Sequence, residues 1–321
     1  MKAVIYKSYG PPDVLMIEDV EKPTPKDNEV LVKVYASSVN PVEWYTMTGL
    51  FLARIGNGLF KPKDTRLGTD YAGVIEVVGK NVTDFKPGDE VYGGRSGAFA
   101  EYVCVQKAIT HKPANVTFEQ AGGVAIAALT ALQGLRDHGQ LQAGQKVLIN
   151  GASGGVGTFA VQIAKALGAE VTGVCSPHNV ELIRSLGADH VIDYTKEDFT
   201  RKGKSYDLLL DIAGSRSWSE CKRVLNPKAN LVIVGGPKTN RWIGPLGHVI
   251  KLRLGALRAS QKVLFFVASF KREDFICLNE MFERGQIKTV VDRVYPLGEI
   301  SEAMRYLGTG HAKGKIVVTL R

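Results

Sequence analysis

Alternation of apolar and polar residues dominates the first 110 or so residues of the chain. The runs at 29–35 and 72–78 are rich in β-branched residues and are bounded by Gly, Pro, Asn and Asp, which is typical of half-buried strands. Lys86-Pro87-Gly88-Asp89 is a turn signal directly before another strand at 90–92. This pattern predicts a mostly antiparallel β domain at the start of the chain.

After Pro113 the pattern changes to an alternation of strands and helices. Thr117 and Gln120 have the spacing of a capping box, and the small apolar segment 121–135 behind them predicts a largely buried helix. Apolar strands then alternate with helices, which predicts a parallel sheet with helices on both faces. The strands are expected at 147–149, 170–175, 190–194, 207–211 and 231–234, and the helices at 158–167 and from Ser176 to Gly187.

The fold class that follows is α/β, with a doubly wound parallel-sheet domain and a separate, mostly antiparallel β domain. A length of 321 residues suits two domains better than one. We expect residues 1–120 to form the first part of the β domain and residues 121–262 the parallel-sheet domain. Residues 263–321 are expected to return to the β domain and to end in a strand at 315–319.

Composition is that of an ordinary globular protein, with 45% hydrophobic and 23% charged residues. The polar turn at 8–12 follows the first apolar residues at once, which leaves no room for the apolar region of a secretory signal. The apolar stretch 263–270 is too short to cross a bilayer, which takes about 20 residues. We therefore expect a soluble, cytoplasmic protein without a transmembrane segment.

Four isolated cysteines stand at positions 104, 175, 221 and 277. No two of them have the close spacing of a zinc knuckle or a redox pair. Buried, reduced thiols are the interpretation that this spacing favours.

The formal net charge of +9 is concentrated in the segment 221–272, which contains no Asp or Glu. Such a segment can serve an anionic cofactor, a nucleic acid or an anionic membrane surface. Because its basic residues are spread among apolar ones, we favour a solvated face and expect no nucleic-acid partner, with peripheral membrane contact left open. The basic residues are Lys222, Arg223, Lys228, Lys238, Arg241, Lys251, Arg253, Arg258, Lys262, Lys271 and Arg272.

A glycine-rich turn, Gly151-Ala152-Ser153-Gly154-Gly155-Val156-Gly157, lies between a predicted strand and a predicted helix. Glycines let the backbone turn sharply and approach a pyrophosphate, which then meets the N–H groups and the dipole of the following helix. The context makes this a dinucleotide-binding signal. The expected contacts are Ser153, Gly154, Gly155, Val156 and Gly157.

The end of the next strand predicts the choice of cofactor. A site for NAD places Asp or Glu there to bind the ribose 2′-hydroxyl, whereas this chain has Cys175-Ser176-Pro177-His178-Asn179 and no acid before Glu181. A hydroxyl, a helix N-terminus and a basic neighbour attract a 2′-phosphate. Cys175, Ser176 and His178 are therefore expected to contact the adenosine end of NADPH, which is favoured over NADH.

Further motifs occur along the whole chain. Gly68-Thr69-Asp70-Tyr71-Ala72-Gly73 is followed by motifs at 77–82, 85–91, 97–102, 128–131, 186–194 and 310–318. With the glycine turn, they resemble the medium-chain dehydrogenase/reductase superfamily, specifically its zinc-independent, quinone oxidoreductase-like branch. The resemblance implies a Rossmann domain and a GroES-like catalytic domain.

Zinc ligands are replaced at two positions of this pattern. Where the superfamily's alcohol dehydrogenases have the Cys and the His that hold catalytic zinc, this chain has Asn40 and Thr69. Neither is a usual zinc ligand, so no metal is expected, and alcohol oxidation lacks a Lewis acid to drive it. The resemblance instead implies hydride transfer to a conjugated system, which carries the developing charge as an enolate.

Individual residues acquire roles by the same resemblance. Asn40 and Tyr45, from the family's Asn-Pro-Val-Glu-x-Tyr motif, are the catalytic candidates; the alternatives are a turn residue before Pro41 and simple packing. Lys315 resembles a late lysine near the cofactor or the active site, and a surface charge is the alternative. The other residues implied to contact the cofactor are Thr130, Tyr194, Gly235, Phe265, Phe266 and Val267.

The function hypothesis is an NADPH-dependent oxidoreductase that acts on the activated C=C bond of enones and 2-alkenals or on quinones. The alternative is a nucleotide-binding protein with little catalysis, which binds RNA, a partner or an anionic membrane through 221–272. Loops at 45–65 and 241–259 are expected to set the substrate, and the first suggests an apolar one. The apolar strand at 263–267 is expected to pair across a homodimer.

Overall fold

The computed structural model describes residues 1–201, 203, 205–236 and 244–320. The chain divides into two compact units. The first consists of Met1–Leu129 and Ser269–Arg321, and the second of Thr130–Ala268. The α/β fold class expected from the sequence is confirmed, while the exact ranges 1–120, 121–262 and 263–321 remain a prediction of the domain boundaries.

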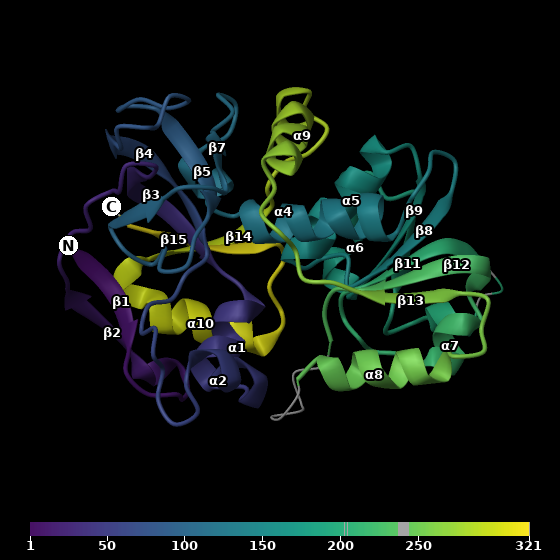
Figure 1. The fold of residues 1–321 in the computed structure, drawn as a ribbon. Helices are drawn as coiled ribbons and strands as arrows, with labels where there is room; N and C mark the ends of the chain where they lie inside the picture. The colour runs from purple at the N-terminus through teal and green to yellow at the C-terminus, as the bar shows by residue number, and fades with distance from the viewer. Residues whose placement is uncertain (202, 204, 237–243, 321) are drawn as a thin grey trace. The chain divides into compact units, whose positions relative to one another are not determined.

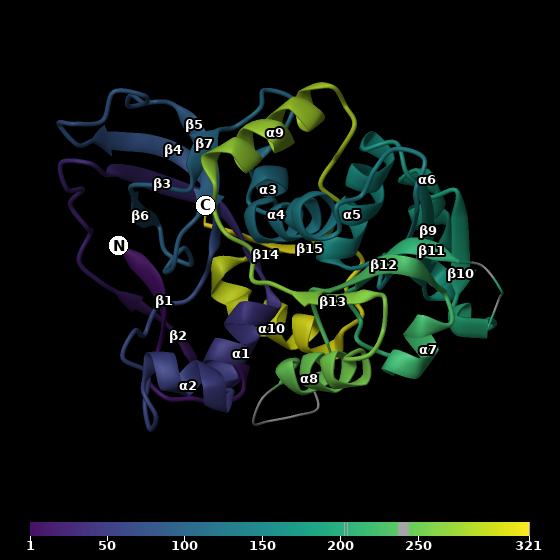
Figure 2. The same cartoon turned by 45° about the vertical axis from the view of Figure 1, so that its right-hand side comes forward.

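The first unit is built on a seven-stranded sheet within the described residues, with the order β14-β15-β3-β4-β5-β7 and β6 paired to β3 (Figures 1 and 2). Neighbouring strands within this sheet are antiparallel, except that β14 and β15 run parallel. A separate hairpin joins β1 (Lys2–Tyr6) to β2 (Leu15–Asp19). The sheet strands are β3 (Val30–Val39), β4 (Asp70–Val78), β5 (Glu90–Gly94), β6 (Tyr102–Val105), β7 (Ile109–His111), β14 (Val291–Pro296) and β15 (Lys315–Thr319).

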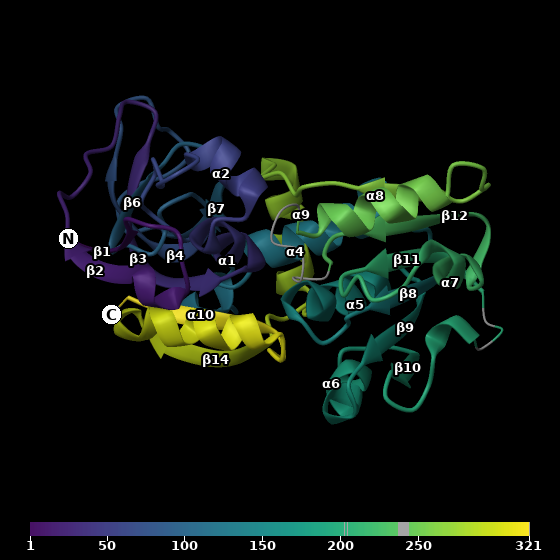
Figure 3. The same ribbon diagram turned by 90° about the horizontal axis from the view of Figure 1, so that it is seen from below.

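Short helices cover this sheet. Figure 3 shows α10 running beside β14, and the buried Ile300, Ala303 and Met304 of α10 pack with Ile316 and Val318 of β15. The described helices that lie wholly within the unit are α1 (Pro41–Thr48), α2 (Phe51–Asn57), α3 (Phe118–Ala121), α9 (Arg272–Glu283) and α10 (Ile300–Thr309), with 3₁₀ turns at Pro12–Val14 and Leu297–Glu299.

The second unit contains a six-stranded parallel sheet with the order β10-β9-β8-β11-β12-β13. Counted from β8, this is the order 3-2-1-4-5-6 of a doubly wound dinucleotide-binding fold. Its strands are β8 (Lys146–Asn150), β9 (Glu170–Cys175), β10 (His190–Asp193), β11 (Tyr206–Asp211), β12 (Leu225–Ile233) and β13 (Lys262–Phe265).

Helices lie on both faces of the parallel sheet, with α5 and α6 above it and α7 and α8 below it in Figures 1 and 2. On the α7 and α8 side, Trp218, Val249 and Leu252 are buried in one cluster with Leu209 and Leu231 of the central strands. The helices are α5 (Gly155–Ala166), α6 (Val180–Ser185), α7 (Trp218–Lys222) and α8 (Leu246–Gly255), with 3₁₀ turns at Pro177–Asn179 and Phe199–Arg201.

The prediction of a single helix at 121–135 is wrong in detail. The structure has α3, a turn at Gly122-Gly123, then α4 (Ala125–Leu132) and a π-helical segment, Gln133–His138. A Cβ on Gly122 would lie 2.9 Å from the carbonyl carbon of Ala36 in β3. Close packing against the sheet therefore fixes these glycines, and their low helix propensity interrupts the helix there.

The segments expected to be substrate loops are partly helical. Residues 45–65 contain the end of α1 and all of α2, and residues 246–255 of the expected loop 241–259 form α8. Residues 241–243 of that loop, and Lys238 and Arg241 of the basic segment, lie outside the described residues. No described helix is long and apolar enough to cross a membrane.

Candidate active site

Asn40 stands where β3 ends and α1 begins. It is the N-cap residue, with extended backbone angles of φ −132° and ψ 161°, and Pro41 occupies the first helical turn, where its fixed φ and missing N–H suit a helix start. The Asn40 N–H donates to Glu43 Oε2 at 2.7 Å, which is one half of a capping box. Asn40 thus has the place of a turn residue before Pro41, which was one of its two interpretations. Its backbone is fixed there by the start of α1.

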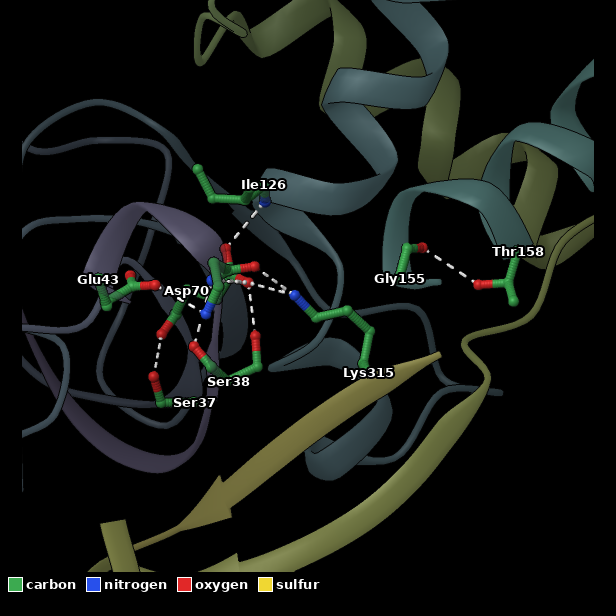
Figure 4. Close-up of polar contacts among 9 residues, drawn as sticks. Ser37, Ser38, Glu43, Asp70, Ile126, Gly155, Thr158 and Lys315 are labelled. Carbon is green, nitrogen blue, oxygen red and sulfur yellow. Dashed lines mark hydrogen bonds and ion pairs between the residues drawn. The ribbon is translucent and has the colours of Figure 1, made fainter. Parts of the chain in front are cut away.

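Asp70, the first residue of β4, receives the Asn40 side chain. Its carboxylate is fully buried and accepts hydrogen bonds from Ser38 Oγ at 2.6 Å, Asn40 Nδ2 at 3.1 Å and the Ile126 N–H at 2.8 Å (Figure 4). The antiparallel register of β3 and β4 places Ser38 opposite Asp70. Buried charges persist only where hydrogen bonds or opposite charges compensate them, and Asp70 has both.

The opposite charge comes from Lys315, the first residue of β15. Its Nζ lies 2.5 Å from Asn40 Oδ1 and 3.3 Å from Asp70 Oδ2, and only 3% of the residue is exposed. The alternative of a surface charge is therefore wrong for Lys315. Gly123 makes room for its stem, since a Cβ there would lie 3.2 Å from Lys315 Cβ.

Together these contacts fix the orientation of the Asn40 amide. Nδ2 donates both to Ser38 O at 3.2 Å and to Asp70 Oδ2, so both of its hydrogens have partners inside the protein. Oδ1 accepts from Lys315. The structure therefore brings together Asn40 and Lys315, two residues that the sequence analysis assigned to different roles.

Glu43 and Thr69 extend this cluster. Glu43 is 2% exposed, and burial raises its pKa to about 7, with Asp70 adding to the rise. The nearby Thr69 hydroxyl and the charge of Lys315 oppose part of this rise. The buried Oε1 of Glu43 has no hydrogen-bond partner among the described residues.

Tyr45, the other catalytic candidate, lies one turn into α1 and is partly buried. Burial raises the pKa of its phenol, so the phenol keeps its proton at neutral pH. The catalytic role of Tyr45, like the alternative of a packing role, remains a prediction.

The side chains of this cluster do not fit a zinc site. Asn40 and Thr69 stand at the positions of two ligands, and the Lys315 ammonium bonds to the Asn40 oxygen. Within the part of the chain that the structure describes, no group of three His, Cys, Asp or Glu side chains could hold a metal ion. A cationic neighbour and amide or hydroxyl groups are poor surroundings for Zn²⁺.

In the second unit, the glycine turn joins β8 to α5. Gly151 has φ +93°, which favours glycine, and a Cβ on Gly157 would lie 2.2 Å from Gly151 O. A Cβ on Gly154 would meet nothing closer than 3.8 Å, so the backbone there is open to a ligand. The residues 153–156 are partly exposed, and the first N–H groups of α5 have no acceptor within the helix. Thr158 Oγ1 donates to Gly155 O at 3.1 Å and steadies this first turn (Figure 4).

The end of β9 offers a hydroxyl and a histidine. Cys175 is buried, and burial raises the pKa of its thiol to about 11, so it can contribute packing and backbone groups only. Ser176 Oγ makes no cap bond to the backbone and instead accepts from Asn179 Nδ2 at 3.0 Å. His178 is exposed, and Tyr194 is 54% exposed. This donor set, without a carboxylate at the strand end, fits a 2′-phosphate.

A second buried aspartate, which the sequence analysis missed, lies beneath the glycine turn. Asp211 ends β11 and is 1% exposed. It accepts from Asn150 Nδ2 at 2.8 Å and the Gly214 N–H at 3.0 Å, and His248 Nε2 lies 3.2 Å away. Asn150 immediately precedes the turn, so this network holds the point where the chain leaves β8.

The remaining predicted cofactor contacts have these positions in the second unit. Thr130 is partly buried near the end of α4. Gly235 follows β12, and a Cβ there would lie 2.2 Å from Ile212 O. Phe265 ends β13, Phe266 stacks on His138 with ring centroids 4.1 Å apart, and Val267 is 82% exposed. Their contact with a cofactor remains a prediction.

Glu43, Asp70, Asp211 and His248 were not singled out from the sequence. One signal was available for the two aspartates: each is an acid at one end of an apolar strand, Asp70 at the start of β4 and Asp211 at the end of β11. Their partners Lys315 and His248 lie 245 and 37 residues away along the chain. The pairing therefore depends on strand order and was not visible in local patterns.

Two family models match the chain. An alcohol dehydrogenase GroES-like domain matches residues 26–116, and a zinc-binding dehydrogenase domain matches residues 186–318. The NADPH-dependent alkenal/one oxidoreductase, chloroplastic, of Arabidopsis thaliana is 36% identical over 338 residues, which cover 99% of this chain and 79% of that protein. The quinone oxidoreductase QR1, chloroplastic, of Triphysaria versicolor is 35% identical and covers 99% of this chain and 98% of its own.

The solved structures agree with the sequence relatives. The quinone oxidoreductase from Coxiella burnetii superposes with a TM-score of 0.86 at 29% identity, over 100% of this chain and 99% of that one. A doubly wound unit and a GroES-like unit in one chain define a dehydrogenase/reductase architecture. This chain belongs to the medium-chain dehydrogenase/reductase superfamily, in its quinone oxidoreductase-like branch.

Proposed function

We propose that this protein is a zinc-independent, NADPH-dependent reductase of the activated C=C bond of enones and 2-alkenals, or of quinones. The observation that carries the proposal is the open backbone at Gly154, followed by a strand end without a carboxylate at Ser176. The names of the relatives from Arabidopsis thaliana and Triphysaria versicolor support the same substrate classes.

The second unit supplies the cofactor site in this proposal. The N–H groups at Ser153, Gly154 and Gly155 hold the pyrophosphate, and Ser176 and His178 receive the 2′-phosphate. When bound, the dihydronicotinamide supplies the hydride, and the protein supplies position and electrostatics. Thr130, Tyr194, Gly235 and the segment 265–267 line the rest of the cofactor.

The first unit supplies the groups around the substrate. Asp70 and Lys315 hold the Asn40 amide in one orientation. The amide is then a preorganised polar group that does not have to reorient during the reaction. The Tyr45 phenol donates a hydrogen bond to the carbonyl oxygen, where negative charge develops. Because the charge of Lys315 is balanced by Asp70, the pair serves in this proposal to fix the orientation of the Asn40 amide.

Loss of nicotinamide absorbance with NADPH or NADH, measured against a panel of enones and quinones, tests the proposal. We expect turnover with NADPH at rates well above those with NADH, and a loss of about a hundredfold for Asn40→Ala, which removes a preorganised polar group. Tight NADPH binding without turnover of any substrate would instead favour the nucleotide-binding alternative.

A homodimer through β13 is the quaternary arrangement that we propose. β13 is at one end of the parallel sheet, and no described strand pairs with its outer edge. An open, apolar strand edge is a ready surface for a second copy of the chain. Light scattering at micromolar concentration should give twice the chain mass of 34.9 kDa; a monomeric mass would contradict the arrangement.

Peripheral membrane contact is a second candidate role, favoured by the exposed face of α8 and by the turn that follows it. Ile250, Leu254 and Leu257 are between 51% and 78% exposed, and Lys251, Arg253 and Arg258 are exposed beside them. An apolar face flanked by cations suits an anionic lipid surface. Co-sedimentation with anionic but not neutral vesicles, weakened by salt, is the expected result. A cytoplasmic location likewise remains a proposal.

A further inference from the structure

The helix α2 is oriented opposite to an ordinary surface helix. No residue of α2, which the structure describes in full, is buried, and its large apolar side chains Phe51, Leu52 and Ile55 are between 37% and 61% exposed. A surface helix usually turns its apolar side chains towards the core and its polar ones towards water. Packing within the unit therefore does not account for the apolar residues of α2.

The polar side chains of α2 instead hold the helix to the rest of the unit. Arg54 Nε donates to Gly49 O at 2.8 Å, and the guanidinium lies over the Tyr9 ring, 4.6 Å from the ring centroid. Asn57 Nδ2 donates to the hydroxyl of the buried Tyr6 at 2.6 Å. Because these two polar side chains face the protein, the apolar ones are left on the outside.

The bend that follows α2, residues 58–63, extends the exposed apolar surface. Leu59 is 52% exposed and Phe60 is 95% exposed. The Lys63 N–H donates to Asn57 O at 2.6 Å and closes the bend. The backbone of the bend is thus fixed, while its two large apolar side chains lie in solvent.

Cations flank this surface, and acidic residues are absent from its sequence. Lys61 and Lys63 are exposed in the bend, and residues 44–63 include no Asp or Glu. The next acid along the chain, Asp64, lies with its Oδ1 3.5 Å from Arg66 Nε. An apolar surface flanked by lysines fits an anionic lipid layer, in which apolar side chains reach the acyl boundary and lysines extend to the headgroups.

We propose that α2 and the bend 58–63, together called the α2 surface, insert into the headgroup region of an anionic membrane. The inference rests on the membrane role proposed above, and it adds a contact in the other unit that is independent of α8. Exposed apolar patches on a protein mark binding sites for proteins or membranes, and the lysines favour the membrane.

Co-sedimentation with vesicles of phosphatidylcholine, with and without phosphatidylglycerol, tests the α2 surface. The double variant Ile55→Gln with Phe60→Gln should bind anionic vesicles at least about tenfold more weakly, because two apolar side chains no longer leave water. Lys61→Gln with Lys63→Gln should lose about fivefold for each charge at low salt. The melting temperature should stay unchanged in both, because these side chains are exposed in the free protein.

Ile276→Gln in α9 is the matched control. Ile276 is 47% exposed, but Glu273 and Glu280 lie one helical turn away on either side, so this face should not approach an anionic lipid. The variant should bind vesicles as the native protein does. A loss as large as that of Ile55→Gln with Phe60→Gln would contradict the inference.

The variant Phe60→Trp measures insertion directly. Its tryptophan emission should shift to shorter wavelength when anionic vesicles are added, and lipids with brominated acyl chains should quench it. The same spectra of the native protein correct for its own tryptophans. Quenching by a water-soluble quencher alone would show that residue 60 stays in water, and the inference would fail.

Other occupants of the α2 surface give different results. If only Leu254→Gln with Leu257→Gln abolishes vesicle binding, the membrane contact belongs to α8 and the α2 surface is not inserted. If Ile55→Gln with Phe60→Gln leaves vesicle binding intact, the surface binds a second copy where the variant halves the mass in light scattering, and it binds substrate where the variant raises KM for an apolar enone. If the native protein binds no anionic vesicle, the membrane role fails at both surfaces, whereas the proposed reductase activity is judged separately by turnover.

Discussion

Each unit of the molecule buries one aspartate at a strand end, and the two aspartates are compensated differently. Asp70 in the first unit meets Lys315, and Asp211 in the second meets His248. Both bind the side-chain amide of an asparagine, Asn40 or Asn150. In the first unit the amide belongs to the predicted catalytic residue, and in the second it belongs to the residue that immediately precedes the glycine turn.

The two networks share one arrangement, a buried aspartate that binds an asparagine amide and a basic side chain, but the burial of the basic side chain differs. Lys315 and Asp70 are almost completely buried, so the pair must stay intact and holds Asn40 rigidly. The His248 side chain is 12% exposed, against 4% for that of Lys315, so replacing His248 opens Asp211 to solvent more readily than replacing Lys315 opens Asp70. We infer that the network around Asp70 is the more sensitive of the two to loss of its basic partner.

The largest effect is expected when Lys315 is replaced. Lys315→Met leaves the carboxylate of Asp70 buried without its opposite charge, which typically lowers the free energy of unfolding by about 3 kcal/mol. Urea unfolding measures this loss. The double variant Lys315→Met with Asp70→Asn should recover part of it, because no uncompensated charge remains; no recovery would show that Lys315 acts by packing alone.

An intermediate effect is expected at the glycine turn. Gly157→Ala forces a Cβ to within 2.2 Å of Gly151 O, so the turn must shift, and we expect NADPH binding to weaken at least about tenfold, or 1.4 kcal/mol, along with stability. Gly154→Ala is the matched control for stability, because its Cβ meets nothing in the protein closer than 3.8 Å. Calorimetry should show weaker NADPH binding there without a lower melting temperature.

The smallest effect is expected at His248. His248→Leu removes one of several hydrogen bonds to Asp211 and should lower the free energy of unfolding by about 1 kcal/mol. A loss as large as that of Lys315→Met, measured by the same urea titration, would contradict the contrast between the two networks.

Much of the architecture could be predicted from local patterns. The strand at 170–175 and the final strand at 315–319 coincide with β9 and β15, because β-branched runs between turn signals define them without tertiary information. The capping box of Thr117 and Gln120 is likewise present. The helix break at Gly122-Gly123 was not predicted, because it depends on the approach of Ala36 from another strand.

The cluster around Asn40 could be predicted only in part. Asn40 and Lys315 were found through resemblance, but they lie 275 residues apart along the chain. Their contact requires that β15 pair with β3. The raised pKa of Glu43 is a property of burial between three elements, and its place in the sequence is that of an ordinary capping residue. Sequence patterns identify a group's chemistry more readily than they identify its surroundings.

Lys315 also bears on the conditions under which such a site works. The positive charge beside Asn40 is covalently part of the polypeptide, so every folded molecule carries it in one-to-one ratio. It is not diluted when the protein is purified, it does not compete with other proteins for a scarce ion, and a chelator has no means of extracting it. The charges at this site are therefore set by the fold and do not vary with the supply of metal ions in the compartment.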